Sequence, residues 1–210
     1  MFQTFDVSTV SASSSAPIKF EHGESYPAIC LGVWNATKTY NEEAKNGMGL
    51  IVAIADENNN IVYRSLFINL SGYVLSSKAT YCRLYQNLLR VGDTDSALQE
   101  KIKASGLGDF RALVGRPCLA LMKVKENKDG KPWSSLEMIS GETSRSKGLS
   151  VDVATLPPID VRKVFGKFIE IKNLDDCVIM EGVKTVDPLA KVDDGIEFVT
   201  KEKEVEASLF

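Results

Sequence analysis

The sequence predicts a mainly β fold, with one or two helices between the third and fourth of five strands. Between residues 25 and 140, three runs with apolar residues at strand spacing come first. A stretch with helical spacing follows, and two more strand-like runs complete the order. This order is the connectivity of a five-stranded, OB-like Greek-key barrel. Residues 148–210 lack a clean period and predict a C-terminal extension beyond the barrel.

The first expected strand covers residues 26–34. Alternation divides its side chains into two sets, with Ile29, Leu31 and Val33 on one side and Tyr26, Ala28, Cys30, Gly32 and Trp34 on the other. Gly32 lacks a side chain and marks the position of a bend or bulge. Residues 35–46 are polar and predict a long loop that contains Lys38 and Tyr40.

Residues 48–56 and 61–69 predict a β-hairpin, because the asparagines at 58–60 tolerate left-handed backbone. One face of this hairpin is apolar and is expected in the core: Leu50, Val52, Ile54, Leu66 and Ile68. The other face is mixed and is not a plain solvent face: Ile51, Ala53, Ala55, Tyr63, Ser65 and Phe67.

The helical stretch follows the third strand. Its apolar residues fall at the i, i+3, i+4 and i+7 positions of one helix face: Tyr81, Leu84, Tyr85 and Leu88. This spacing predicts a helix from about residue 78 that ends by Gly92. A second, shorter helix is expected to run to about residue 104, before Gly106.

Residues 118–126 and 133–139 predict a second hairpin, with Gly130 at the left-handed position of its loop. A three-residue loop places Lys125 directly opposite Trp133, and Lys123 opposite Ser135. The core face of this hairpin is then Ala120, Met122, Val124, Leu136 and Met138.

The pattern divides the chain into four segments. Residues 1–18 are rich in serine and predict a flexible N-terminal arm, and residues 19–147 form the OB-like barrel domain. Residues 148–192 form the C-terminal extension. Residues 193–210 mix glutamate with lysine and predict a mobile charged tail, whose removal is expected to leave folding intact.

Composition and motifs exclude several classes of function. The chain is 44% hydrophobic and 25% charged, as in soluble globular proteins, and it has neither a long apolar run nor a secretory signal. P-loop, GxSxG and HExxH motifs are absent and His22 is the only histidine, so no catalysis is expected. The four cysteines are scattered, which predicts reduced thiols and neither a metal site nor a cofactor.

Aromatic side chains and lysines off the predicted core indicate a nucleic-acid surface. Bases stack on aromatic rings with about 1–3 kcal/mol per base, and lysines contact phosphate. The expected stacking residues are Trp34, Tyr63, Phe67 and Trp133. The expected contacts from lysines and from the loop after the first strand are Lys38, Tyr40, Lys123, Lys125, Lys128 and Lys131. The alternative is that these rings pack under the C-terminal extension, with Lys125 stacked on Trp133.

Four stretches carry a resemblance to a known family. These are KFEHGESYPAICLGVW, SLFINLSGYVLSSKATYCRLYQNLLRV, LVGRPCLALMKVKENKDGKPWSSLEMISG and LPPIDVRKVF. Over residues 19–165 their pattern resembles that of bacteriophage OB-fold single-stranded-DNA-binding proteins. The resemblance implies DNA binding in phage replication or recombination. Phe210 after an acidic stretch resembles a partner-docking tail, which implies phage or host replication proteins as partners, although Lys201 and Lys203 interrupt the acidic run.

These observations together predict a non-enzymatic protein that binds single-stranded DNA without sequence specificity in the cytoplasm of an infected host. No membrane partner is expected, and the sequence leaves the oligomeric state open. The alternative is a phage structural or assembly protein that uses the same barrel as a protein-interaction module. The weak positive charge of residues 1–150 favours this alternative.

Overall fold

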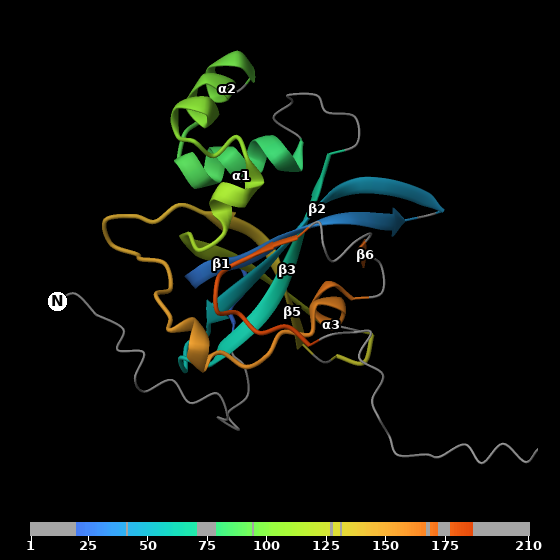
Figure 1. Cartoon of the computed structure of the whole chain (residues 1–210). Coiled ribbons are helices and arrows are strands. Elements are labelled where there is room, and N and C mark those ends of the chain that lie inside the picture. The colour runs from blue at the N-terminus through green and yellow to red at the C-terminus, as the bar shows by residue number, and fades with distance from the viewer. Residues whose placement is uncertain are drawn as a thin grey trace, which may run out of the picture.

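The fold is mainly β, as the sequence predicts (Figure 1). The computed structural model describes residues 20–40, 42–70, 79–93, 95–126, 128–130, 132–166, 169–171 and 177–186. In this described part, seven strands form one sheet whose ladders are all antiparallel. Hydrogen-bonded neighbours follow the order β3-β2-β1-β4-β5, and the short strands β6 and β7 pair with β1 outside this path. The expected arm at residues 1–18 and the expected tail at 193–210 lie outside the described residues.

The five main strands and the helices between β3 and β4 agree in order with the sequence prediction. The main strands are β1 (Ser25–Tyr40), β2 (Glu43–Ala55), β3 (Ile61–Asn69), β4 (Pro117–Glu126) and β5 (Pro132–Ser140). The added strands are β6 (Ile169–Ile171) and β7 (Cys177–Ile179). The helices are α1 (Thr80–Leu89), α2 (Asp95–Ala104) and α3 (Val161–Phe165), with 3₁₀ turns at Phe110–Leu113 and Val153–Thr155.

The sheet is open along one seam. Within the described residues no ladder joins β3 to β5, so the sheet does not close into a barrel by backbone hydrogen bonds. A side chain crosses the seam instead, because Arg64 on β3 donates from Nη2 to Ser134 Oγ on β5 at 3.1 Å. Arg64 also donates from Nη1 to the Tyr63 carbonyl at 2.9 Å, and its guanidinium carbon lies 6.0 Å from the Phe20 ring centroid.

A bulge in β1 changes which side chains share a face. The register with β2 shifts between Cys30 and Gly32, where the sequence predicts a bend or bulge. Simple alternation therefore fails after Leu31. Cys30 and Val33 pack in one core, while Leu31 and Trp34 pack in a second core on the other side of the sheet.

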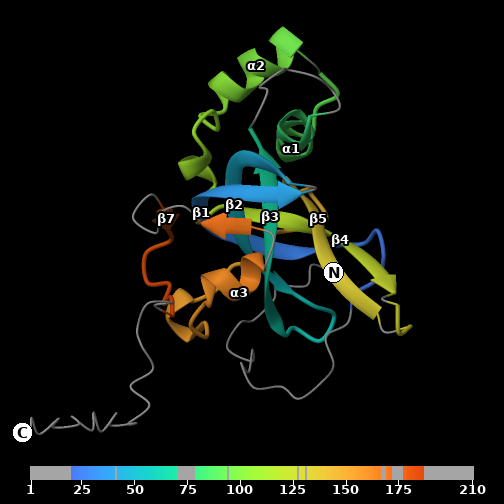
Figure 2. The same ribbon diagram turned by 90° about the vertical axis from the view of Figure 1, so that its right-hand side faces the viewer.

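The first core lies between the sheet and the helices α1 and α2. The apolar face of α1 is buried as its spacing predicts, with Leu84 and Tyr85 fully enclosed. The predicted core face of the first hairpin lies here, and so does that of the second hairpin except for Val124, which is half-buried outside this core. Both views show α1 and α2 on one side of the sheet and α3 on the other (Figures 1 and 2).

The second core is made by the C-terminal extension against the other face of β1 and β2. Leu156, Ile159, Val161 and Phe165 of the extension are buried there together with Ile51 and neighbouring strand residues. The Phe165 ring lies so close to Gly49 that a Cβ added at that glycine would approach the ring to 2.4 Å. A larger residue at position 49 would therefore displace the extension.

The two predicted turns have the expected local chemistry. Asn59 adopts a left-handed conformation with φ 60°, and Asp56 Oδ1 accepts hydrogen bonds from the backbone of Asn58 and Asn60, both at 2.8 Å. In the second hairpin, Lys125 pairs with Trp133 and Lys123 with Ser135, so the predicted register is confirmed. Gly130 has φ 72°, as its position in the loop requires.

The expected loop at residues 35–46 is wrong. β1 and β2 continue there as a paired ribbon, from Asn35 opposite Met48 to Tyr40 opposite Glu43. The stretch is polar because many of its side chains are exposed on a ribbon at the sheet margin, while its backbone stays hydrogen-bonded. β6 adds to the other edge of this ribbon, at Ala36 to Lys38.

Candidate nucleic-acid interface

Trp34 is buried, so its expected place off the core is wrong. Its side chain is 0% exposed and meets the Phe165 ring edge to face, with centroids 5.8 Å apart. The bulge at Leu31 turns Trp34 into the second core, and the C-terminal extension covers it there. A base cannot stack on this ring while the extension is in place, so for Trp34 the alternative of packing under the extension holds.

Tyr63 is also held by the extension. Its hydroxyl donates to the Pro157 carbonyl at 2.8 Å, and its ring packs against the second core. Desolvation by burial raises the pKa of Tyr63 to about 12. The neighbouring Ser65 donates from Oγ to the Val164 carbonyl at 2.9 Å, so β3 is tied to the extension at two points.

Phe67 on β3 and Lys38 on β1 lie together. The Lys38 ammonium is 5.9 Å from the Phe67 ring centroid, at cation–π distance, and both side chains are half-buried. Lys38 lies in β1 opposite Lys45, and not in the expected loop. Tyr40 is the last residue of β1, and its side chain lies outside what the structure describes.

The second hairpin presents the exposed part of the predicted set. Trp133 is 48% exposed and lies opposite Lys125, which is also exposed. Lys128 is exposed in the loop, and Lys131 lies outside the described residues. Lys123 Nζ is 3.9 Å from Glu137 Oε1, a partly exposed pair of the kind that contributes at most about 1 kcal/mol.

The structure therefore divides the predicted residues into separate groups. Lys38 lies near the C-terminal end of β1, where it pairs with Lys45 near the start of β2. β4 pairs with the N-terminal end of β1, from Ser25 to Ile29, and the second hairpin continues beyond Ser25. Lys38 and Phe67 are thus near one end of β1, and Trp133 with its lysines is near the other. Between them, the extension covers Trp34 and Tyr63.

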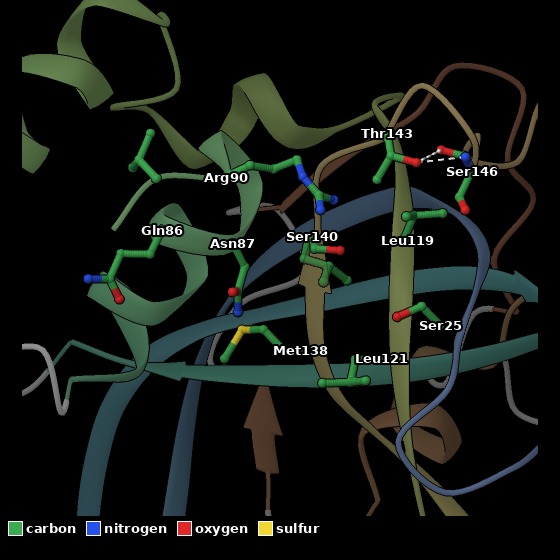
Figure 3. A pocket seen from close by; sticks show the side chains of 12 residues that line it. Ser25, Gln86, Asn87, Arg90, Leu119, Leu121, Met138, Ser140, Thr143 and Ser146 are labelled. Carbon is green, nitrogen blue, oxygen red and sulfur yellow. Dashed lines mark hydrogen bonds between the residues drawn. The ribbon is translucent and has the colours of Figure 1, made fainter. Parts of the chain in front are cut away.

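A groove that sequence reasoning missed adjoins the second hairpin (Figure 3). It has a volume of about 620 Å³ and lies between the end of α1, the strands β4 and β5, and residues 143–146. Arg90, at the end of α1, extends toward Ser140 on β5. Leu121 and Met138 form the apolar floor of the groove. Its residues are far apart in sequence and have no shared motif, so only the fold brings them together.

Three of the four cysteines are buried in the described structure. Cys30, Cys82 and Cys118 are buried and unbridged, and Cys177 is half-buried and unbridged. Desolvation raises the pKa of Cys30 to about 12 and raises the pKa of Cys118 as well. Their thiols therefore stay protonated at neutral pH, when a thiolate would be needed for nucleophilic attack.

No group of three or more His, Cys, Asp or Glu side chains in the described ranges is placed to hold a metal ion. No described helix is both long and apolar enough to cross a membrane. Comparisons with known protein families, with curated proteins and with solved structures give no match to this chain.

Proposed function

We propose that this chain binds single-stranded DNA without sequence specificity, through the outer face of the β4–β5 hairpin. The observation that carries the proposal is the pairing of an exposed Trp133 with Lys125 across the hairpin. The indole offers a π-face to any base, and the ammonium lies where a phosphate flanking that base would pass. Lys123 and Lys128 extend the positive charge along the strand and into the loop.

Within this proposal the fold is an OB-like Greek-key barrel whose seam is closed by side chains. The strand order β3-β2-β1-β4-β5 brings β3 and β5 to the two edges, where Arg64 reaches Ser134. Among the described residues, helices between main strands occur only between β3 and β4, which agrees with that topology. The resemblance to phage single-stranded-DNA-binding proteins supports the same interpretation, and with it a role in phage replication or recombination inside an infected host.

Trp34 and Tyr63 lie outside the proposed binding face, because the C-terminal extension covers them. Each large apolar side chain of the extension that is buried contributes about 1.5–3 kcal/mol. Releasing Leu156, Ile159, Val161 and Phe165 together would then cost on the order of several kcal/mol, even after the entropy gained by the freed segment. Stacking of one or two bases returns only about 1–3 kcal/mol each, so the extension stays in place and DNA uses the hairpin.

A protein-interaction module of a phage particle is the second candidate. The covered outer face of β1 to β3 favours it, because that is the surface on which OB-folds commonly bind nucleic acid. An exposed Trp with flanking lysines also suits a protein interface, where tryptophan is a frequent anchor. The two candidates differ in salt dependence, since phosphate contacts weaken steeply as salt rises.

Binding of fluorescein-labelled oligo-dT, followed by anisotropy at two salt concentrations, separates the candidates. The wild-type chain should bind at low salt and release DNA as salt rises. Trp133→Ala should weaken binding by about thirtyfold, as expected for the loss of one base stack of about 2 kcal/mol. Tyr26→Phe, a change in an aromatic residue away from the hairpin face, is the control. No binding at low salt would reject DNA binding and leave the protein-interaction module.

A further inference from the structure

The groove beside α1 is a formed feature with fixed walls. Arg90 donates from Nη1 to the Gly141 carbonyl at 3.1 Å, and the Gly141 amide donates to the Asn87 carbonyl at 3.1 Å. These bonds join the end of α1 to the segment that leaves β5. A Cβ at position 141 would lie 2.3 Å from the Leu88 carbonyl oxygen, so only glycine permits this approach. These contacts fix the end of α1 against the segment that follows β5.

The lining of the groove selects for an anionic ligand that also has an apolar face. Arg90 is its one charged side chain among the described residues that line it, and none of them carries a carboxylate. Leu121 and Met138 form an apolar floor, and a methionine thioether contacts aromatic rings favourably. Asn87 adds a carboxamide that both donates and accepts hydrogen bonds. A base on the floor, with its phosphate at the guanidinium, satisfies all of these groups.

The groove continues the hairpin face along β4. Alternate residues of a strand share a face, so Lys125 and Lys123 are followed by Leu121 and Leu119. Their partners across the ladder are Trp133 and Ser135 on one side of a register shift between Leu121 and Met122, and Met138 and Ser140 on the other side. Glu137, which lies 3.9 Å from Lys123, is the extra residue of β5 at this shift. Six residues of β4 span about 20 Å, so one surface runs from Trp133 to the groove.

We propose that the groove is a second subsite of the single-stranded DNA track, which takes one nucleotide beyond those held at the hairpin. This inference rests on the proposed function and adds the path of the strand. One end of the track is the Trp133 and Lys125 pair, and the other end is Arg90. Arg90 contacts a phosphate, and the apolar floor of Leu121 and Met138 supports the adjoining base.

The length dependence of binding tests this path. Anisotropy is measured with oligo-dT of about four, eight and twelve nucleotides, which bracket the smaller site sizes of OB-folds. Wild-type affinity should rise from the shortest to the middle length as the strand reaches the groove. Arg90→Gln should remove roughly tenfold from the affinity for the longer strands, and Arg90→Lys should restore part of it. Arg83→Gln removes the same charge from an exposed site elsewhere on α1 and is the matched control.

A second variant fills the groove without changing its charge. Ser25 is exposed and lies opposite Leu121, so Ser25→Phe places a ring in the groove and should reduce the gain with length. Thermal melts of each variant check that it is folded. In a ¹⁵N NMR titration, thymidine 5′-monophosphate alone should shift the Asn87 side-chain amide resonances.

The outcomes separate the subsite from the proposed function. If Trp133→Ala weakens all lengths while both groove variants keep the wild-type gain with length, the subsite is wrong and hairpin binding stands. If Arg90→Gln and Ser25→Phe weaken binding while Trp133→Ala does not, the groove stands and the hairpin site is wrong. If no oligonucleotide binds the wild-type chain and thymidine monophosphate causes no shift, both proposals are rejected.

Discussion

The indole of Trp34 and the ring of Phe165 meet edge to face, 5.8 Å apart with their planes inclined by 81°. This contact joins a residue of β1 to a helix in the extension, 131 positions later in the chain. Edge-to-face aromatic pairs contribute about 0.5–1.5 kcal/mol beyond the area they bury. The extension is therefore part of the folded domain, and its removal would expose the apolar face of β1 and β2.

Replacing Phe165 should destabilise the whole domain. Phe165→Ala leaves a cavity over Trp34 and Gly49, and substitutions of this kind lower the free energy of unfolding by about 3–5 kcal/mol. Urea unfolding followed by circular dichroism measures the loss. Val186→Ala, at an exposed position of the same extension, is the control and should change stability by less than about 0.5 kcal/mol. A loss below 1 kcal/mol for Phe165→Ala would mean that the extension docks weakly.

Only one of the two tryptophans should respond to DNA. Trp133 is half-exposed and Trp34 is enclosed, so stacked bases should quench the emission of Trp133 alone. Trp34→Phe should keep the quenching on addition of oligo-dT, and Trp133→Phe should abolish it. Acrylamide provides an independent reference, because it should quench Trp133 far more than Trp34. Quenching that persists in Trp133→Phe would show that the extension opens.

The turn and faces of the first hairpin and the register of the second could be predicted from the sequence because they depend on neighbouring residues. The turn residues Asn59 and Gly130 fix the loops, and alternation then fixes the partners, down to Lys125 opposite Trp133. The helix face from Tyr81 to Leu88 was accessible for the same reason, since its period is local. The length of β1 could not be predicted, because its polar residues 35–40 have the composition of a loop.

Only part of the candidate site could be predicted from the sequence. The burial of Trp34 could not be predicted because the bulge turns it to the face of β1 that the C-terminal extension covers, and no local pattern shows where the extension docks. Gly49 also indicates the covered face, because a glycine within a strand permits the close approach of the Phe165 ring. The groove could not be predicted from the sequence, because Arg90, Leu121 and Ser140 share neither a period nor a motif and meet only in the folded chain.

The lysines of the second hairpin should set the salt dependence of DNA binding. Each phosphate contact contributes a slope of about −0.7 to log K against log salt on a single strand. Lys123→Ala, Lys125→Ala and Lys128→Ala together should therefore flatten the slope by about 2. The matched control changes three exposed lysines elsewhere, Lys103, Lys163 and Lys184. If the control flattens the slope equally, the lysines act through overall charge and not through contacts at the hairpin.

The burial of Tyr63, whose hydroxyl donates to the Pro157 carbonyl, should make stability fall at alkaline pH. Burial raises the pKa of Tyr63 from 10.0 to about 12, so the folded chain holds the phenol proton more tightly than the unfolded chain does. The stabilisation linked to that proton is complete below pH 10 and is lost as the pH rises from 10 to 12. Tyr63→Phe lacks this proton and should be less stable than wild type by about 0.5–1.5 kcal/mol at pH 8, for loss of the hydrogen bond.

Urea unfolding at several pH values should show the difference in unfolding free energy between the two proteins narrowing above pH 10. Cys30 titrates in a similar range in both proteins, so it cancels in the comparison. A gap that stays constant up to pH 12 would mean that Tyr63 ionises without opposing the fold and that the extension leaves its hydroxyl open to water.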